Sequence, residues 1–418
     1  MRAAKRERRG FTAVELIAAI TASLVVAAAA YMLARTSLTV FQQEARMNSA
    51  QFSNIMGMNR IATDAKRAGY QSSPDASTDR TSVCGGGPVP GTLGQLLTAV
   101  RITDEPAGGD SVPGGAPPNY PLFPPAVTDA DNLRKPDRIR FSGNYTTSER
   151  FKLANVVGDQ LAVECDQLSV QRVFSSAATG GPSFCALFPI GSVARVVDPA
   201  GKAQFVEVTQ CTPSATTNSY TSLVLRVSGL GTGGCVTSPS QGYVNPVNVV
   251  DYFLTNLKAS SGDNVALGLP ASINTYALED AALDGITGEQ SRMSLVRRML
   301  DVDGAPILGS GEVVADYVAD LKFSARKATP LAVGLTQLNF NDNLNGEPAN
   351  QLRTLGIRLT TRARNPDRVA GPPPGNQDLP LTLFAVFPAA TVAQFKYARV
   401  RTMFMEVNLP NLGAYLPW

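Results

Sequence analysis

The feature that most constrains this chain is a long uncharged run near the N-terminus, which begins directly after one acidic residue. Residues 16–34 carry no charged side chain, and Glu15 precedes them. A helix of that length spans roughly 28 Å, about the thickness of the hydrocarbon core of a bilayer. A carboxylate within a membrane-spanning helix costs roughly 2.5–3.5 kcal/mol on insertion scales, so Glu15 requires a partner. A free amine created by cleavage just before Phe11 would supply one.

The first ten residues are basic and carry five Lys or Arg side chains against one Glu. The positive-inside rule therefore places the start of the helix on the cytoplasmic side of a membrane. The whole chain has a formal net charge of +3, whereas removal of residues 1–10 leaves 32 basic and 33 acidic residues. The net positive charge thus comes from residues 1–10, which cleavage before Phe11 would remove. We expect no nucleic-acid binding, because that function needs a basic patch on the mature chain.

The junction between Gly10 and Phe11, with basic residues before it and Glu15 after it, resembles the cleavage signal of type IV prepilins and pseudopilins. In that family a prepilin peptidase cuts after the glycine and methylates the new amino terminus. The resemblance implies processing at Gly10 and Phe11, and an assembly role for the Phe11 amine and the Glu15 carboxylate, which would attract one another across neighbouring helices. Two other interpretations are a Sec signal peptide cleaved near residues 28–30 and a plain single-pass anchor.

Apolar residues recur at largely helical spacing beyond the uncharged run. The pattern stops near Gly69, and Pro74 forbids a simple continuation, so we predict one helix from about residue 11 to about residue 68. We expect residues 11–34 to span the membrane and residues 35–70 to form a periplasmic amphipathic continuation whose apolar face lies on a globular head. The residues of that face are Leu38, Phe41, Ala45, Phe52, Ile55, Met56 and Ala62.

The end of the predicted helix, residues 61–70, resembles the D-x-R-x-A-G-Y ending found in PilW-type minor pilins. The matching residues are Asp64, Ala68, Gly69 and Tyr70. Lys66 occupies the position where the pattern commonly has arginine. The same residues also fit an ordinary helix C-terminus, with basic side chains at the negative end of the helix dipole and a glycine cap.

The rest of the chain is predicted to be rich in strands, because runs of β-branched residues alternate with turn residues. The predicted strands are residues 138–141, 160–165, 192–197, 204–208, 222–227, 248–254 and 294–300. Residues 313–321 favour a short helix or turn before residues 322–324. The order of residues 318–323, 355–362 and 400–409 resembles the C-terminal strands of PilW and of J-type minor pseudopilins.

We therefore predict an α+β fold of the type IV pilin class, with a long N-terminal helix packed on a β-rich head. Residues 1–10 form the leader peptide in this prediction, and residues 71–418 form the head. The head divides into a variable region, residues 71–290, and a PilW/J-like sheet, residues 291–418.

The five cysteines contain no C-x-x-C pair, which argues against a zinc or thioredoxin-like site. If the helix starts in the cytoplasm, all five lie on the far side of the membrane, where disulfides persist. Connectivity cannot be deduced from the sequence. The pairing with the shortest loops joins Cys165 to Cys185 and Cys211 to Cys235, and it leaves Cys84 over.

The chain contains no histidine, which removes the usual general base, the Ser-His and Cys-His nucleophile pairs and the commonest metal ligand. We therefore expect neither an enzyme nor any catalytic residue. Asn341, Asn343 and Asn345, followed by Gly346, resemble part of a calcium loop, although Leu352 stands where that loop needs glutamate. An Asn-Gly turn is the favoured interpretation. Calcium at the three asparagines is the alternative, and no other cofactor is expected.

The resemblance implies a minor pilin of PilW type, held in the inner membrane by one helix with a periplasmic head. After leader removal it would join the initiation or tip complex of a type IV pilus. The implied partners are other major and minor pilins, the prepilin peptidase, the pilus assembly platform and membrane lipid. The alternatives are a J-type minor pseudopilin of a type II secretion system and a tip adhesin whose region from residue 71 binds a surface or ligand. The sequence alone does not distinguish a pilus from a pseudopilus.

Overall fold

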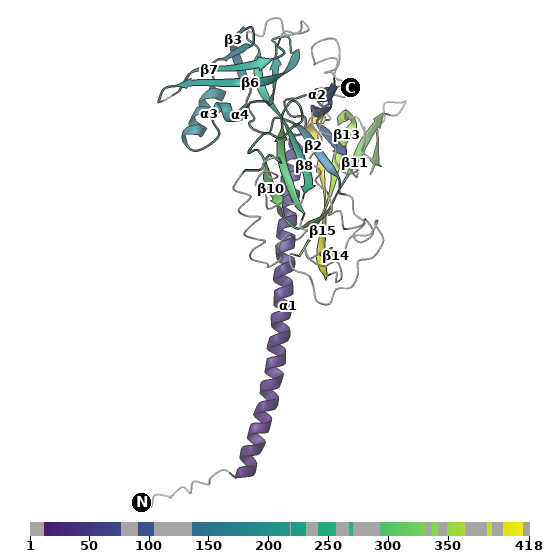
Figure 1. Ribbon diagram of the computed structural model, residues 1–418. Helices are drawn as coiled ribbons and strands as arrows, with labels where there is room; N and C mark the ends of the chain where they lie inside the picture. The colour runs from purple at the N-terminus through teal and green to yellow at the C-terminus, as the bar shows by residue number, and fades with distance from the viewer. Residues whose placement is uncertain are drawn as a thin grey trace, which may run out of the picture. The chain divides into compact units, whose positions relative to one another are not determined.

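The computed structural model describes residues 12–76, 91–103, 136–217, 219–230, 241–255, 267–270, 293–330, 336–341, 349–363, 383–386 and 396–412 (Figure 1). The chain forms two compact units, Met1–Ser49 and Ala50–Trp418. The described part of the first unit is the beginning of helix α1. The second unit contains the end of α1 and the β-rich region, a name used below for the described residues from Ala68 onward.

Helix α1 spans Ala13–Arg67, a length of 55 residues. Alanine recurs throughout α1, proline is absent and Gly57 is its one glycine. Alanine has the highest helix propensity, and an interior proline would interrupt the hydrogen-bond ladder, so this composition favours an unbroken helix. The predicted helix from about residue 11 to about residue 68 is confirmed.

The larger sheet of the β-rich region is antiparallel at every pairing of its described strands. Its strands are β1 (Val100–Thr103), β2 (Arg138–Gly143), β3 (Phe151–Val157), β4 (Gln160–Val163), β5 (Val193–Val197), β6 (Ala203–Ala215), β7 (Tyr220–Ser228), β8 (Tyr243–Thr255), β9 (Ser294–Leu300) and β10 (Glu312–Ala315). The helices α2 (Gly91–Leu96), α3 (Leu168–Ala178) and α4 (Phe184–Leu187) fall between these strands in the chain.

Strand β8 belongs to two parts of this sheet. Its first residues pair with β3 and β5, which closes a ring in the order β8-β3-β4-β7-β6-β5. From Asn248 onward β8 instead lies between β2 and β9. Pro246 lies where β8 passes from one part of the sheet to the other. There it pairs with Ala194 of β5 on one side, and neither β3 nor β2 pairs with it on the other side. A proline fits there because it has no N–H to donate to a second neighbour.

The second sheet has the order β12-β11-β13-β15-β14 and is also antiparallel. Its strands are β11 (Val318–Pro330), β12 (Thr336–Asn341), β13 (Leu352–Arg362), β14 (Leu383–Val386) and β15 (Lys396–Asn408). This part of the chain also contains two short 3₁₀ helices. The first, η1 (Ala349–Gln351), precedes β13, and the second, η2 (Pro410–Leu412), follows β15.

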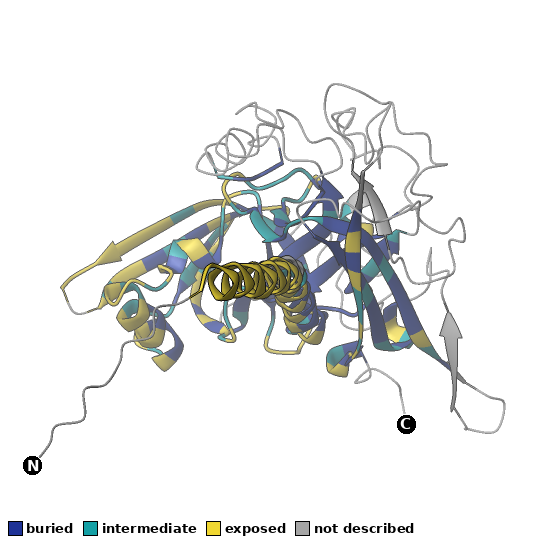
Figure 2. Cartoon of the chain, turned by 90° about the horizontal axis from the view of Figure 1, so that it is seen from below, coloured by how far each residue is buried: buried dark blue, intermediate teal, exposed yellow. Residues whose placement is uncertain are grey.

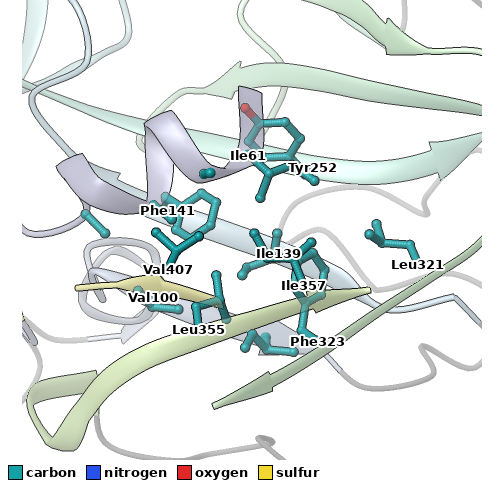
Figure 3. Packing of buried hydrophobic residues seen from close by; sticks show 14 of the residues in the cluster. Ile61, Val100, Ile139, Phe141, Tyr252, Leu321, Phe323, Leu355, Ile357 and Val407 are labelled. Carbon is teal, nitrogen blue, oxygen red and sulfur yellow. The ribbon is translucent and has the colours of Figure 1, made fainter. Parts of the chain in front are cut away.

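The main hydrophobic core joins the last turns of α1 to both sheets. Ile61 of α1 lies in one cluster with Phe141 and Tyr252 of the larger sheet and with Leu355 and Ile357 of the second sheet (Figure 3). A separate core fills the ring of strands and includes residues of α3 and α4. In Figure 2 the strands carry long buried stretches, whereas α1 is coloured as exposed through its apolar segment.

Most strand predictions are confirmed, including all seven runs between residues 138 and 300. Residues 355–362 and 400–409 lie largely in β13 and β15, as expected. The short helix or turn predicted over residues 313–321 is wrong, because β10 and the start of β11 occupy that segment and only a bend separates them. The structure thus has an N-terminal apolar helix followed by a region dominated by sheets.

Candidate functional site

The part of α1 from Ala13 to Leu38 is long and apolar enough to cross a membrane. These 26 residues have a mean hydropathy of 2.2, and all are exposed in the structure (Figure 2). At 1.5 Å per residue they measure about 39 Å, which exceeds a hydrocarbon core of ~30 Å. A cleaved signal sequence would satisfy the same criterion. Whether this helix is a membrane anchor or a cleaved signal sequence therefore has to be judged from Glu15 and the residues around it.

Glu15 is held in the first turn of α1 by reciprocal hydrogen bonds with Thr12. The backbone N–H of Thr12 donates to Glu15 Oε2 at 3.0 Å, and the Thr12 hydroxyl donates to the same oxygen at 2.9 Å. The Glu15 N–H donates in turn to Thr12 Oγ1 at 3.3 Å. This arrangement is a capping box, in which both side chains satisfy backbone N–H groups that lack helical partners. The carboxylate therefore already has two donors within its own chain.

The predicted processing residues, Gly10 and Phe11, lie outside the described residues. The pairing of the Phe11 amine with Glu15 therefore stays a prediction. The capping box modifies it in one respect, because the amine of a neighbouring chain is not the only partner open to this carboxylate.

The face of α1 that packs on the β-rich region is not the one predicted. Phe52, Ile55 and Met56 are exposed by 65%, 36% and 52% of their surface, and Leu38 and Phe41 are exposed as well. Of the predicted face only Ala62 is buried, and the side chain of Ala45 lies outside the description. The buried residues of this part of α1 are Ala50, Asn54, Gly57, Met58, Ile61, Ala62, Asp64 and Ala65.

Close approach and hydrogen bonding explain which face is buried. A Cβ atom on Gly57 would lie 2.8 Å from Leu359 Cδ2 and 3.2 Å from Ala315 Cβ, so a larger residue here would require these side chains to move. Asn54 Nδ2 donates to the carbonyls of Leu359 and Arg401 at 2.9 and 3.0 Å, which ties α1 to β13 and β15. Small and polar residues thus help to select the packed face, which also buries Met58 and Ile61, whereas Phe52, Ile55 and Met56 point away from it.

The outward residues Phe52, Ile55 and Met56 are named here the exposed stripe. Their spacing of three and four residues places them on one side of the helix. Contiguous exposed apolar surface on a folded protein usually marks a site of contact with a partner or a membrane.

Asp64, the first residue of the helix-end motif, forms a buried ion pair between α1 and the larger sheet. Its Oδ2 accepts hydrogen bonds from Arg297 Nε of β9 at 2.6 Å and from the Tyr252 hydroxyl of β8 at 2.7 Å. Burial, followed by the charge of Asp64, raises the pKa of Tyr252 well above its usual value, so this hydroxyl remains a donor. Removing one partner of such a buried pair is strongly destabilising, because the remaining charge is left buried without compensation.

The glycine of the same motif ends α1. Gly69 has a φ of +74°, which glycine adopts at little cost, and its N–H donates to Ser142 O of β2 at 2.8 Å. The approach is so close that a Cβ atom on Gly143 would lie 2.6 Å from Arg67 O. The motif residues Asp64 and Gly69 therefore both dock the helix end on the sheet, which is a structural role independent of any family resemblance.

Buried amide side chains extend this junction to the ring of strands. Asn144 Nδ2 donates to Gln71 Oε1 at 2.8 Å, and Asn245 Nδ2 of β8 donates to Gln71 O at 2.9 Å. Gln71 Nε2 completes the network with Ser148 O at 2.8 Å. These hydrogen bonds connect Gln71, which follows α1, to Asn144 just after β2 and to the start of β8.

Strands β2, β8 and β9 carry a second buried charge cluster around Asp251. Arg138 of β2 forms a two-point contact with the Asp251 carboxylate at 2.7 and 2.8 Å, and Arg298 Nε of β9 donates to it at 2.9 Å. Arg140 Nε lies 3.5 Å from the same carboxylate. Burial acts to raise the pKa of Asp251, but the arginines outweigh it and hold that pKa well below the usual value.

The disulfide connectivity differs from the shortest-loop pairing. Cys185 of α4 is bonded to Cys211 of β6, so neither Cys165–Cys185 nor Cys211–Cys235 forms. Among the described cysteines Cys165 carries a free thiol, whose pKa is raised by burial and by the charge of Asp166. Cys84 and Cys235 lie outside the described residues. The observed bond joins a helix to a strand of the ring.

Loss of this disulfide should destabilise the ring of strands. Replacing both Cys185 and Cys211 with serine frees a loop of 26 residues, and the chain-entropy model gives a loss of about 3.5 kcal/mol. Urea denaturation of the purified protein, followed by fluorescence, measures the free energy of unfolding. Cys165→Ser is the matched control and should leave it within about 0.5 kcal/mol of the parent. Equal effects of the double and the control variant would contradict the assignment.

Most of the alternative calcium site, Asn341, Asn343 and Asn345, lies outside the described residues. Asn341 ends β12, whereas Asn343 and Asn345 are not described. Within the described ranges no group of three or more His, Cys, Asp or Glu side chains could hold a metal ion.

Comparisons of the chain with models of known protein families, with curated proteins and with solved structures found no match.

Proposed function

We propose that this chain is a filament subunit, a minor pilin of PilW type. It is inserted in the inner membrane, cut by prepilin peptidase between Gly10 and Phe11, and transferred into the initiation or tip complex of a type IV pilus. The observation that carries the proposal is the exposed apolar segment Ala13–Leu38 with Glu15 fixed in its first turn. An exposed apolar helix of this length requires a covering surface, which either a membrane or the helical centre of a filament would supply.

Side-chain size along α1 supports packing against other helices. Residues 27–30 are all alanine, and small residues allow close helix approach where the hydrophobic effect cannot drive association. The exposed stripe then offers larger apolar side chains farther along the helix. The pair formed by Glu15 and the Phe11 amine of a neighbour would fix the register between helices, because an unmatched charge in apolar surroundings is costly.

The leader cut gives the direct test. We expect N-terminal sequencing of the protein from its native host to begin at methylated Phe11, and deletion of the prepilin peptidase to restore a start at residue 1. The peptidase deletion is the control, since general signal peptidases remain active in it. A mature start near Tyr31 would indicate a Sec signal peptide, and an uncut chain in the presence of the peptidase would contradict the proposal.

A second candidate function, a tip adhesin, is favoured by the ring of strands, which has its own core and its own disulfide. A soluble fragment for binding assays must begin at or before Ala50 rather than at residue 71, because Met58 and Ile61 fill the main core.

A gene deletion distinguishes a PilW-type minor pilin from the alternative, a J-type minor pseudopilin. Deletion of the gene should impair twitching for a pilus and protein secretion for a type II system.

A further inference from the structure

The Glu15 carboxylate lies in an apolar stretch that offers it few partners. Residues 16–34 contain no basic side chain, and Arg35 is 20 positions away along the helix, about 30 Å. The two hydrogen bonds that Glu15 Oε2 accepts within the described residues both come from Thr12. Among the described residues, Thr12 is therefore the group that satisfies this carboxylate.

We infer that Thr12 is a positioning residue that holds Glu15 in the free membrane-inserted subunit and releases it when a neighbouring amine arrives. The inference rests on the proposed function and adds a step to it. Cleavage before Phe11 leaves the Thr12 N–H as an ordinary amide, so the capping box survives processing. Glu15 then exchanges a neutral hydroxyl donor for a charged amine, and charge-assisted hydrogen bonds are roughly twice as strong as neutral ones.

The physical basis is the cost of burying a polar group. An unsatisfied buried acceptor loses its hydrogen bonds to water without replacement, whereas one that already accepts two hydrogen bonds loses less on leaving water. Thr12 thus lowers the free-energy cost of transferring Glu15 from water into lipid. Because neutral donors bind the carboxylate more weakly than an amine does, the same contact does not prevent the later exchange.

The test measures insertion of the full-length chain into inner-membrane vesicles that lack both the peptidase and other pilins. We expect Thr12→Val to lower the ratio of inserted to non-inserted chain about fivefold, the equilibrium equivalent of losing one hydrogen bond worth about 1 kcal/mol, here the bond from the Thr12 hydroxyl to Glu15 Oε2. Thr12→Ser keeps the hydroxyl and should insert like the parent. Thr21→Val is the matched control, because the Thr21 hydroxyl donates only to the backbone carbonyls of Ile17 and Ala18.

The same substitution in a Glu15→Leu background separates positioning from helix capping. The bond from the N–H of residue 15 to the Thr12 hydroxyl can still form there, so any remaining effect of Thr12→Val measures the cap alone. We expect most of the fivefold effect to disappear. An effect of equal size with and without the carboxylate, or a Thr12→Val variant that inserts as well as Thr21→Val, would overturn the inference.

Filament incorporation provides an independent readout. In the native host, Thr12→Val should lower the amount of inserted protein but leave the fraction of that protein found in filaments unchanged, since the amine can still pair with Glu15. A fraction reduced as far as in Glu15→Ala would place Thr12 in the assembled contact and overturn the holding role. The vesicle assay tests the role of Thr12 without any filament. A failure of the proposed filament function would be recognised separately, from the N-terminal sequence of the mature protein.

Discussion

Replacing Glu15 with alanine is expected to abolish incorporation of the chain into filaments while sparing its insertion in the membrane. The segment Ala13–Leu38 stays apolar in the variant, and loss of the carboxylate removes a cost of roughly 2.5–3.5 kcal/mol in lipid. The neighbouring amine, however, then has no partner in apolar surroundings. Breaking a buried pair from one side costs about 3–5 kcal/mol, which corresponds to a loss of more than about a hundredfold in incorporation.

The measurement compares sheared filaments with the membrane fraction of the native host by immunoblot. Ser23→Ala is the control, because its hydroxyl donates only to the backbone carbonyl of Ile20 at 2.9 Å within the same helix. It should leave both fractions unchanged. Normal incorporation of the Glu15→Ala chain would exclude the carboxylate as an assembly determinant, and poor membrane insertion would assign it to an earlier step.

Features encoded by neighbouring residues could be predicted from the sequence. Helix α1 follows from an alanine-rich segment without proline, and its end follows from Gly69. Strands such as β5 and β9 follow from short apolar runs bounded by turn residues. Helix α3 was not predicted, because it buries only Ser169, Val170 and Val173 and contains several residues of low helix propensity.

Features that depend on distant parts of the chain could not be predicted in the same way. The packed side of α1 is decided by the fit of Gly57 against Leu359 and by the hydrogen bonds of Asn54, and neither appears in a hydrophobic pattern. The bond between Cys185 and Cys211 depends on where α4 lies against β6 rather than on loop length. Of the proposed assembly site, Glu15 is recognisable from its sequence context, whereas its contact with Thr12 becomes visible only in the structure of the first helical turn. The T-x-x-E spacing of a capping box was the available signal.

Replacing Asp251 with asparagine is expected to destabilise the β-rich region by about 3–5 kcal/mol, because it leaves three arginines around a neutral side chain. The two-point contact with Arg138 and the bond from Arg298 would lose their charge-assisted character. Urea denaturation of the detergent-solubilised chain at neutral pH measures the change. The matched control is Glu406→Gln, which removes an exposed ion pair with Arg326 at 2.8 Å and should cost less than about 1 kcal/mol.

The pH dependence of the same variant tests the electrostatic origin of this effect. The arginines hold the pKa of Asp251 well below the value of about 3.9 found in unfolded chains, although burial alone would raise it. Because the pKa is lowered on folding, the stabilising contribution is fully present above about pH 4 and is lost as the pH falls below that value toward the folded-state pKa. The gap in unfolding free energy between parent and Asp251→Asn should therefore be constant from about pH 7 to about pH 5 and narrow in more acidic solution. A gap that stays the same down to about pH 2 would show that the substitution acts through packing rather than through the lost charge.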